Sequence, residues 1–224
     1  MVKKRSTIIF IAIVAAIIIV LAAFIILTNG GSSTSALVGV RKGDEFIYDI
    51  KGYSSSGDSS AMSEEFLELN MTDWYKVTVT DVSGSDVSLD ITWRYINGTE
   101  ISSTSSINVE TGIYYPTNGF YPLYAANLKA NDFIRPHGPD RSTINATSTR
   151  QYASGARETN RRSLVIESYD SQDPTRTWTE NQNIQFDRQT GMLVELRDVN
   201  VYTNPEITLT VVWTLKETNR WTVS

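Results

Sequence analysis

The sequence predicts one all-β domain preceded by a single N-terminal transmembrane helix. Residues 8–27 are all apolar, and several later segments alternate apolar and polar residues with turn residues between them. Alternation with a period of two places one face of a strand on a core and the other face in solvent. The chain has 224 residues, which suffices for one domain and an appendage.

The apolar run has the length and the flanks of a membrane-spanning helix. Its residues would span about 30 Å, the thickness of the hydrocarbon core of a bilayer. Lys3, Lys4 and Arg5 precede it, and positive residues next to a membrane helix stay in the cytoplasm. We therefore expect a cytoplasmic basic tail (1–7), a transmembrane helix (8–27), a Gly/Ser linker (28–36) and an extracytoplasmic β-domain (37–224).

Two other interpretations of the N-terminus stay open. A cleaved signal peptide has similar basic and apolar parts, but its apolar core is usually about 7 to 15 residues long and ends in small residues. A type IV pilin has a longer helix with an early Glu, whereas the first acidic residue here is Asp44. A lipid-modified lipoprotein is excluded, because the chain has no Cys. We favour the retained anchor.

The composition is that of a folded protein with few catalytic groups. Hydrophobic residues make up 41% of the chain and charged residues 20%, which is typical of a globular protein. Cys is absent and His occurs once, so disulfides, thiolate zinc sites, cysteine nucleophiles and multi-histidine centres are excluded. We expect no cofactor and no enzymatic activity.

The predicted outer part is acidic. Three of the 20 Lys and Arg residues precede the apolar run, which leaves 17 basic against 25 acidic residues and a formal charge of −8. Binding to nucleic acid needs a basic patch, so we expect no nucleic-acid partner. Three glycosylation sequons, at Asn70, Asn97 and Asn145, fit a glycosylated surface protein, although such residues also serve as turns.

The clearest predicted strands are residues 86–95 and 207–215. Each places five apolar residues on one face and polar residues on the other, and shorter alternating segments lie at 46–50 and 75–79. We expect about nine strands, paired in sequence in a twisted antiparallel sheet. A curved half-barrel and a two-sheet sandwich both fit this pattern.

Turn residues separate these strands. Asn97-Gly98 predicts a type I′ hairpin turn, and Ser83–Ser85 joins two further strands. In the segment Asp187–Gly191 the glycine is placed to adopt the left-handed conformation. Residues 61–69 could form a short helix capped by Ser63 or could extend the next strand, and 121–129 is the other helix candidate.

One weak internal similarity relates residues 40–46 to residues 128–133. Each has a basic stretch, then Gly or Asn before an Asp, then an aromatic residue that would start a strand. The similarity favours either two related halves of the sheet or one turn type used twice.

An aromatic segment, residues 112–124, is the candidate ligand-binding site. It holds four Tyr and two Pro residues, and aromatic loops beside a sheet can cap an apolar cavity or stack on sugars. The alternative is that the segment closes the core of the sheet. The candidate residues are Tyr114, Tyr115, Phe120, Tyr121 and Tyr124.

Other polar groups give no site. His137 lies in a Pro/Gly-rich loop without a recognisable nucleophile, and no spacing selects a carboxylate pair for glycoside hydrolysis. Asp81, Asp86 and Asp90, or Asp170 and Asp173, offer oxygen ligands for calcium. None of these acidic residues matches a calcium-binding loop, and we expect no metal site.

The chain resembles a set of uncharacterised archaeal envelope proteins. The resemblance lies in the basic N-terminus, the anchor, the Gly/Ser tether, the segment Lys42–Tyr48 and the hairpin Asp187–Glu195. A weaker resemblance, in turns of the pattern D-x-x-T-G-x-L, links it to the LolA/LprG-type carriers. That resemblance implies a curved antiparallel sheet that wraps lipid.

We therefore expect a single-pass cell-membrane protein with an extracellular C-terminal domain that binds an apolar or glycan ligand. The alternative is a structural or adhesive envelope component, such as a pilin-like or other surface assembly. The sequence identifies no protein partner.

Overall fold

A computed structural model describes residues 36–56, 63–116, 120–171 and 175–224. The chain divides into two compact units, residues 1–33 and residues 34–224, and every described residue belongs to the second. The predicted transmembrane helix at 8–27 lies outside the described residues. Within those residues, no helix has the length and apolar character needed to cross a membrane.

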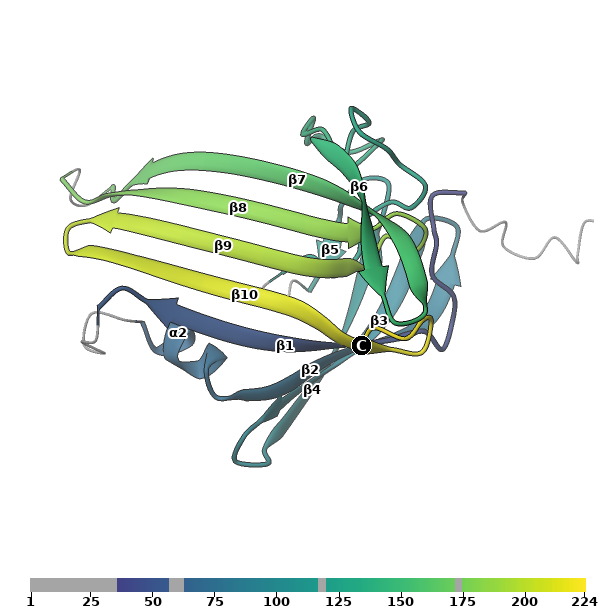
Figure 1. The fold of residues 1–224 in the computed structure, drawn as a ribbon, viewed down its shortest axis with the longest axis horizontal. Coiled ribbons are helices and arrows are strands. Elements are labelled where there is room, and N and C mark those ends of the chain that lie inside the picture. Colours follow the sequence, from purple (N-terminus) through teal and green to yellow (C-terminus); the bar gives the residue numbers. More distant parts are fainter. Residues whose placement is uncertain (1–35, 57–62, 117–119, 172–174) are drawn as a thin grey trace, which may run out of the picture. The chain divides into compact units, whose positions relative to one another are not determined.

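The described part of the chain forms one open antiparallel sheet of ten strands (Figure 1). The prediction of an all-β domain is confirmed. β1 to β5 form one meander and β6 to β10 another, and pairing of β1 with β10 joins them, so β5 and β6 are the sheet edges. The strands are β1 (Glu45–Ser54), β2 (Thr72–Ser83), β3 (Asp86–Tyr95), β4 (Glu100–Asn108), β5 (Tyr114–Tyr115), β6 (Ala146–Tyr152), β7 (Gly155–Tyr169), β8 (Thr177–Asp187), β9 (Leu193–Thr203) and β10 (Glu206–Thr218).

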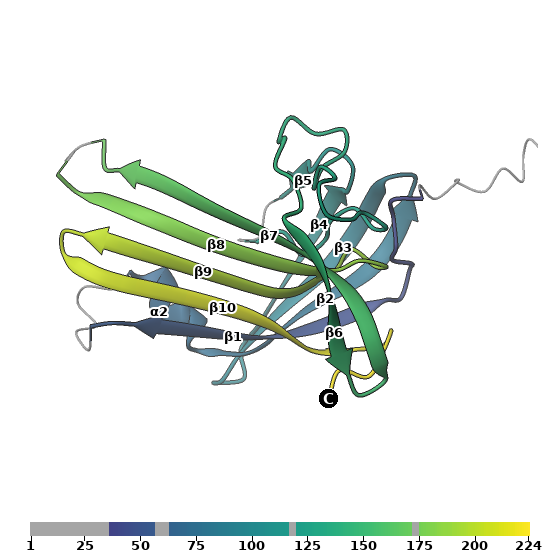
Figure 2. The same ribbon diagram turned by 45° about the horizontal axis from the view of Figure 1, so that its top comes forward.

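The ten strands agree with the expectation of about nine, and the short β5 lies within the aromatic segment, where the sequence predicts a loop. The sheet is strongly twisted: in Figure 2 the long strands β7 to β10 run at a large angle to β2, β3 and β4. The predicted alternation is observed in β3, where Val87, Leu89 and Ile91 are buried. A single core joins these residues to the inward faces of β1, β9 and β10.

The tight turns occur where the sequence predicts them, but one of them is of a different type. Gly191 has φ of +77° and ends the turn that begins at Asp187, as predicted. The Asn97-Gly98 turn is not type I′, because only Gly98 has a positive φ, at +85°. The amide of Gly98 donates to the carbonyl of Tyr95, and the amide of Tyr95 donates to the carbonyl of Thr99. This is a three-residue loop in which the left-handed glycine follows an ordinary turn.

One short helix, α2 (Glu64–Leu69), interrupts the described sheet. Ser63 caps it as predicted, because its hydroxyl accepts a hydrogen bond from the amide of Phe66. Phe66 is buried beside Gly52 of β1, where an added Cβ would lie 3.1 Å from the phenyl ring. The second helix candidate, residues 121–129, is irregular instead.

The irregular segment is fastened to the turn between β8 and β9. Leu123 forms a bridge with Met192. The amide of Tyr124 donates to the carbonyl of Gly191, and a Cβ at Gly191 would lie 2.0 Å from the carbonyl oxygen of Tyr124. Glycine therefore serves two purposes at residue 191: it adopts the left-handed backbone and allows the aromatic segment to approach.

The internal similarity proves to be a shared turn. The carboxylates of Asp44 and Asp132 each accept a hydrogen bond from the backbone amide three residues earlier, in both cases at 2.9 Å. Gly43 and Asn131, which precede them, both have a positive φ. Phe133, however, forms only an isolated bridge and is 40% exposed. The expectation that it starts a strand is wrong.

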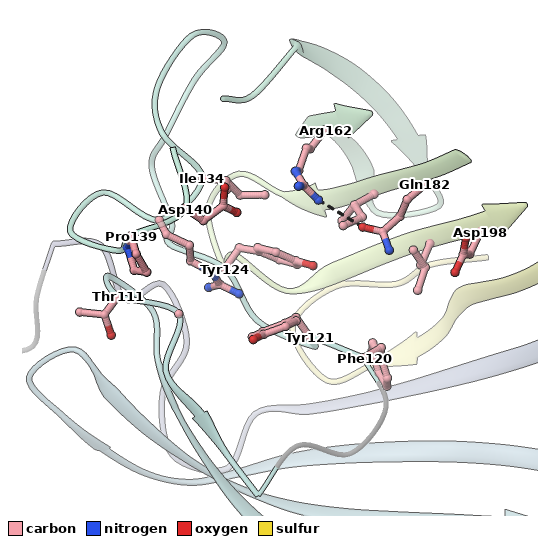
Figure 3. Close-up of a pocket in the computed structure, with 14 residues that line it drawn as sticks. Thr111, Phe120, Tyr121, Tyr124, Ile134, Pro139, Asp140, Arg162, Gln182 and Asp198 are labelled. Atoms are coloured by element: carbon pink, nitrogen blue, oxygen red, sulfur yellow. Dashed lines mark hydrogen bonds between the residues drawn. The ribbon is translucent and has the colours of Figure 1, made fainter. Parts of the chain in front are cut away.

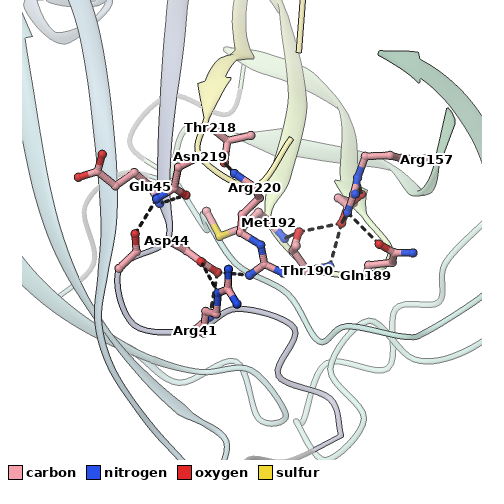
Figure 4. A network of polar contacts seen from close by, with 12 residues as sticks. Arg41, Asp44, Glu45, Arg157, Gln189, Thr190, Met192, Thr218, Asn219 and Arg220 are labelled. Carbon is pink, nitrogen blue, oxygen red and sulfur yellow. Dashed lines mark hydrogen bonds and ion pairs between the residues drawn. The ribbon is translucent and has the colours of Figure 1, made fainter. Parts of the chain in front are cut away.

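The C-terminal tail contacts a buried carboxylate next to β1 (Figure 4). Asp44 is buried and pairs with Arg41 and Arg220. The guanidinium of Arg157, on β7, lies 4.1 Å from the ring centroid of Trp221. These contacts join the tail to the turn before β1 and to β7.

Candidate ligand-binding site

A cavity of about 620 Å³ lies on the inward face of the sheet. Its size is within the range of about 300–1000 Å³ found for small-molecule sites. Distant strands line it, so the sheet curves enough for its two meanders to face each other. Its apolar lining comes from β2 to β4 (Tyr75, Ile91, Trp93, Ile101), from β9 and β10 (Leu196, Leu209, Val211, Trp213), from α2 (Phe66, Leu69) and from Phe120.

Aromatic rings form one end of this apolar cavity. The ring centroids of Phe120 and Trp213 are 3.9 Å apart, and Tyr75 lies 5.3 Å from Phe120 and 5.0 Å from Trp213. The Tyr75 hydroxyl is buried and has no hydrogen-bond partner among the described residues. Burial raises the pKa of Tyr75 well above its ordinary value, so the hydroxyl stays protonated and can donate a hydrogen bond.

A second cavity, of about 480 Å³, adjoins the first and is more polar (Figure 3). Phe120, Leu196 and Asp198 line both cavities and therefore mark their junction. The other walls of the polar cavity come from residues 111–112, from residues 121–140 between β5 and β6, and from β7 and β8. Its polar lining comprises Thr111, Tyr121, Tyr124, Arg135, Asp140, Arg162, Gln182 and Asp198.

Arg135 is the most deeply buried cation of the polar cavity, with only 5% of its surface exposed. Its guanidinium lies 4.6 Å from the ring centroid of Tyr124 and 5.0 Å from that of Tyr121, and it donates to the carbonyl of Leu123. Gly112 has a positive φ, and a Cβ there would lie 2.9 Å from Nε of Arg135. Burial lowers the pKa of Arg135, which an arginine tolerates without losing its charge.

Arg162 approaches the same cavity from β7. One terminal nitrogen donates to Oε1 of Gln182 at 3.2 Å and the other to the hydroxyl of Ser142 at 3.1 Å. Its Nε is buried and has no hydrogen-bond partner among the described residues. In Figure 3, Arg162 and Gln182 lie next to each other, joined by the first of these hydrogen bonds.

Two carboxylates share this cavity with the arginines. Burial acts to raise the pKa of Asp140, but hydrogen bonds from Ser142 and the charges of Arg162 and Arg135 hold that pKa below its ordinary value. At Asp198, burial and the negative charge of Glu180 raise the pKa to about 6. The polar cavity therefore holds a charged Asp140 at one position and a readily protonated Asp198 at the junction.

The structure brings together three of the five predicted aromatic residues. Phe120 lines both cavities, and Tyr121 and Tyr124 line the polar one. Tyr114 is buried in the core and its ring lies 5.4 Å from that of Tyr121. Tyr115 is 79% exposed and lines neither cavity. Part of the segment thus packs in the core while another part lines the site.

The strand residues of the site are not recognisable from the sequence. Arg162, Gln182 and Asp198 lie on three neighbouring strands, and pairing brings Gln182 opposite Asp198. The signal is present in β9: Asp198 follows the buried Leu196 by two positions and therefore shares its face. These residues can be recognised as one site only when the order of the strands in the sheet is known.

The remaining predicted groups lie apart from the cavities. Nδ1 of His137 lies 2.6 Å from Oε2 of Glu110. No group of three or more potential metal ligands occurs among the described residues. The sequon residues Asn70, Asn97 and Asn145 are exposed, and the side-chain oxygen of each accepts a backbone hydrogen bond.

Comparison with known proteins does not identify a family for this chain. No protein-family model matches the chain, and no curated protein is significantly similar to it.

Proposed function

We propose that this chain is a membrane-anchored binding protein whose extracytoplasmic domain holds the apolar part of a ligand. The observation that carries the proposal is the apolar cavity of about 620 Å³ between the two meanders of the sheet. Binding, and not catalysis, is the proposed role. The apolar residues 8–27, with basic residues before them, support an anchor that leaves the domain outside the cell.

The lining of the cavity favours an apolar ligand. A well-packed core fills its interior and leaves few voids larger than a water molecule. Here Trp93, Leu209 and Val211 are only partly buried although they face inward. A ligand that covered them would gain about 25 cal/mol for each Å² of apolar surface removed from water. We further propose that the open, curved sheet acts as a half-barrel around such a ligand, as the resemblance to lipoprotein carriers implies.

Dye binding to a cavity-filling variant tests this proposal. Residues 34–224 form a compact unit that contains the whole described core, so this fragment is suitable for measurements without detergent. A neutral naphthylamine dye should bind it with a rise in fluorescence. Val211→Trp should weaken this binding by about tenfold or more, because the larger side chain occupies space in the cavity.

Val212→Trp is the matched control. It introduces the same side chain at the next position of β10, on the opposite face, and should leave dye binding unchanged. Equal binding by both variants, or none by the wild-type fragment, would overturn the apolar site and favour a structural or adhesive role in the envelope.

A further inference from the structure

We propose that the ligand is an amphiphile with an anionic headgroup, and that Arg135 and Arg162 bind this headgroup in the polar cavity. The inference rests on the proposed function, because the tail of the same molecule would occupy the apolar cavity. Phe120, Leu196 and Asp198 line both cavities, so one elongated molecule can reach from one to the other.

The two arginines of the polar cavity form no ion pair within the described part of the chain. Neither Arg135 nor Arg162 has a carboxylate within salt-bridge distance among the described residues, whereas Arg157 pairs with Asp187 at 2.8 Å. A guanidinium has five N–H donors. Arg135 directs one hydrogen bond to a carbonyl, and Arg162 directs one to an amide and one to a hydroxyl. Burying a charge without a counter-ion is costly, and an anionic ligand would relieve that cost.

The neighbouring acidic groups set the charge of the site. Asp140 accepts hydrogen bonds from the amide and the hydroxyl of Ser142, at 2.8 and 2.5 Å. Its charge offsets one of the two arginines, and Asp198, at the junction of the two cavities, offsets part of the other when it is ionised. A headgroup with one negative charge therefore suits the polar cavity better than a headgroup with two.

Two rings of the aromatic segment hold the guanidinium of Arg135 in place. The rings of Tyr121 and Tyr124 lie within about 5 Å of the Arg135 guanidinium, and such rings attract a cation through their electron-rich faces. They fix its position but leave its N–H groups able to donate. This arrangement suits recognition of an oxyanion, because arginine forms paired hydrogen bonds with carboxylate and phosphate groups.

Photolabelling with two probes that share one tail tests the proposal. The probes are a diazirine-bearing alkyl methyl phosphate, which carries one negative charge, and the corresponding alkyl alcohol, added to residues 34–224 without detergent. Labelled peptides from β9 and β10 report occupation of the apolar cavity. Arg162→Gln should reduce labelling by the phosphate about tenfold relative to labelling by the alcohol, the smaller end of the range for a charged hydrogen bond.

The controls separate charge from folding. Arg162→Lys keeps the positive charge and should retain most of the phosphate labelling, and Arg197→Gln, at an exposed position of β9, should change neither probe. Retained alcohol labelling in Arg162→Gln shows that the variant is folded. Arg135→Lys loses the planar guanidinium that contacts Tyr121 and Tyr124, so it should retain less phosphate labelling than Arg162→Lys.

Each result decides a different part of the account. Equal sensitivity of both probes to Arg162→Gln would overturn the anionic headgroup and leave the apolar site intact. Failure of both probes to label β9 and β10 would overturn the proposed function itself. Displacement of the alkyl phosphate by a tenfold excess of inorganic phosphate would show a site for a free anion, which would also overturn the amphiphile.

Discussion

The ring of Phe120 packs against the ring of Trp213, with 3.9 Å between their centroids. Phe120 comes from the aromatic segment and Trp213 from β10, so this contact connects the segment to the sheet. Because Phe120 also lines both cavities, the same contact forms part of the wall between them. The packing of one residue thus links the stability of the domain to the shape of its proposed site.

Phe120→Ala should therefore destabilise the domain by about 3 to 5 kcal/mol, the usual effect of removing a buried aromatic ring. Urea unfolding of residues 34–224 measures the difference. Tyr115→Ala removes an exposed ring from the same segment and should change the free energy of unfolding by less than about 0.5 kcal/mol. Similar losses at both positions would show that Phe120 does not pack in the core.

A buried ion pair should contribute more than an exposed one. Asp187 is fully buried, and its two carboxylate oxygens accept from Arg157 at 2.8 and 2.9 Å and from Thr190. Asp187→Ala should lower the free energy of unfolding by about 3 to 5 kcal/mol, because it leaves the arginine charge buried.

Glu158→Ala is the comparison for that variant. It removes the partner of Arg188 in a solvent-exposed pair, for which a loss of about 0 to 1 kcal/mol is expected. Urea unfolding under identical conditions compares the two variants. A loss at Asp187 no larger than that at Glu158 would contradict the buried pair.

Asp198 should make stability depend on pH. Its pKa is raised to about 6, above the value near 3.9 of an unfolded aspartate, so the unfolded chain releases this proton first as the pH rises. The folded state binds more protons between about pH 4 and pH 6, and the contribution of Asp198 to stability falls across that window.

Asp198→Asn should consequently be more stable than the wild type above pH 6, and the difference should vanish below about pH 4. Thermal unfolding between pH 3.5 and pH 8 measures it, with Asp90→Asn, an exposed position on β3, as control. A difference that stays constant over this range would rule out the raised pKa.

The three sequons should accept glycans in a host that modifies exported proteins. Asn70, Asn97 and Asn145 are exposed, and changing each to Gln should lower the mass of the secreted domain by one glycan. Asn181→Gln, at an exposed Asn outside any sequon, should leave the glycan mass unchanged. Intact-mass measurement decides this, and an unmodified wild-type chain would contradict it.

The sequence predicts local structure well because the signals for it are local. Val87, Leu89 and Ile91 alternate with polar residues, and Gly191 ends a turn that its neighbours already indicate. The order of the strands in the sheet cannot be predicted from such local signals. Pairing of Ile50 with Trp213 joins the two meanders, and nothing near either residue specifies a partner so distant in the chain.

The candidate site shows the same division. Phe120, Tyr121 and Tyr124 lie in one segment whose composition draws attention to it. Arg162 and Asp198 lie on separate strands, where a polar residue in an alternating pattern is usually interpreted as a solvent-facing position. The twist of the sheet brings them to one cavity, and that twist depends on the packing of all ten strands.

Native mass spectrometry of residues 34–224 tests the central claim most directly. The fragment should be purified without detergent from a host that supplies membrane lipids, beside Val211→Trp and Val212→Trp. We expect a mass excess that disappears on denaturation, is retained in Val212→Trp and is lost in Val211→Trp. A wild-type fragment that shows only the mass of its polypeptide and glycans would contradict a ligand-binding role for this domain.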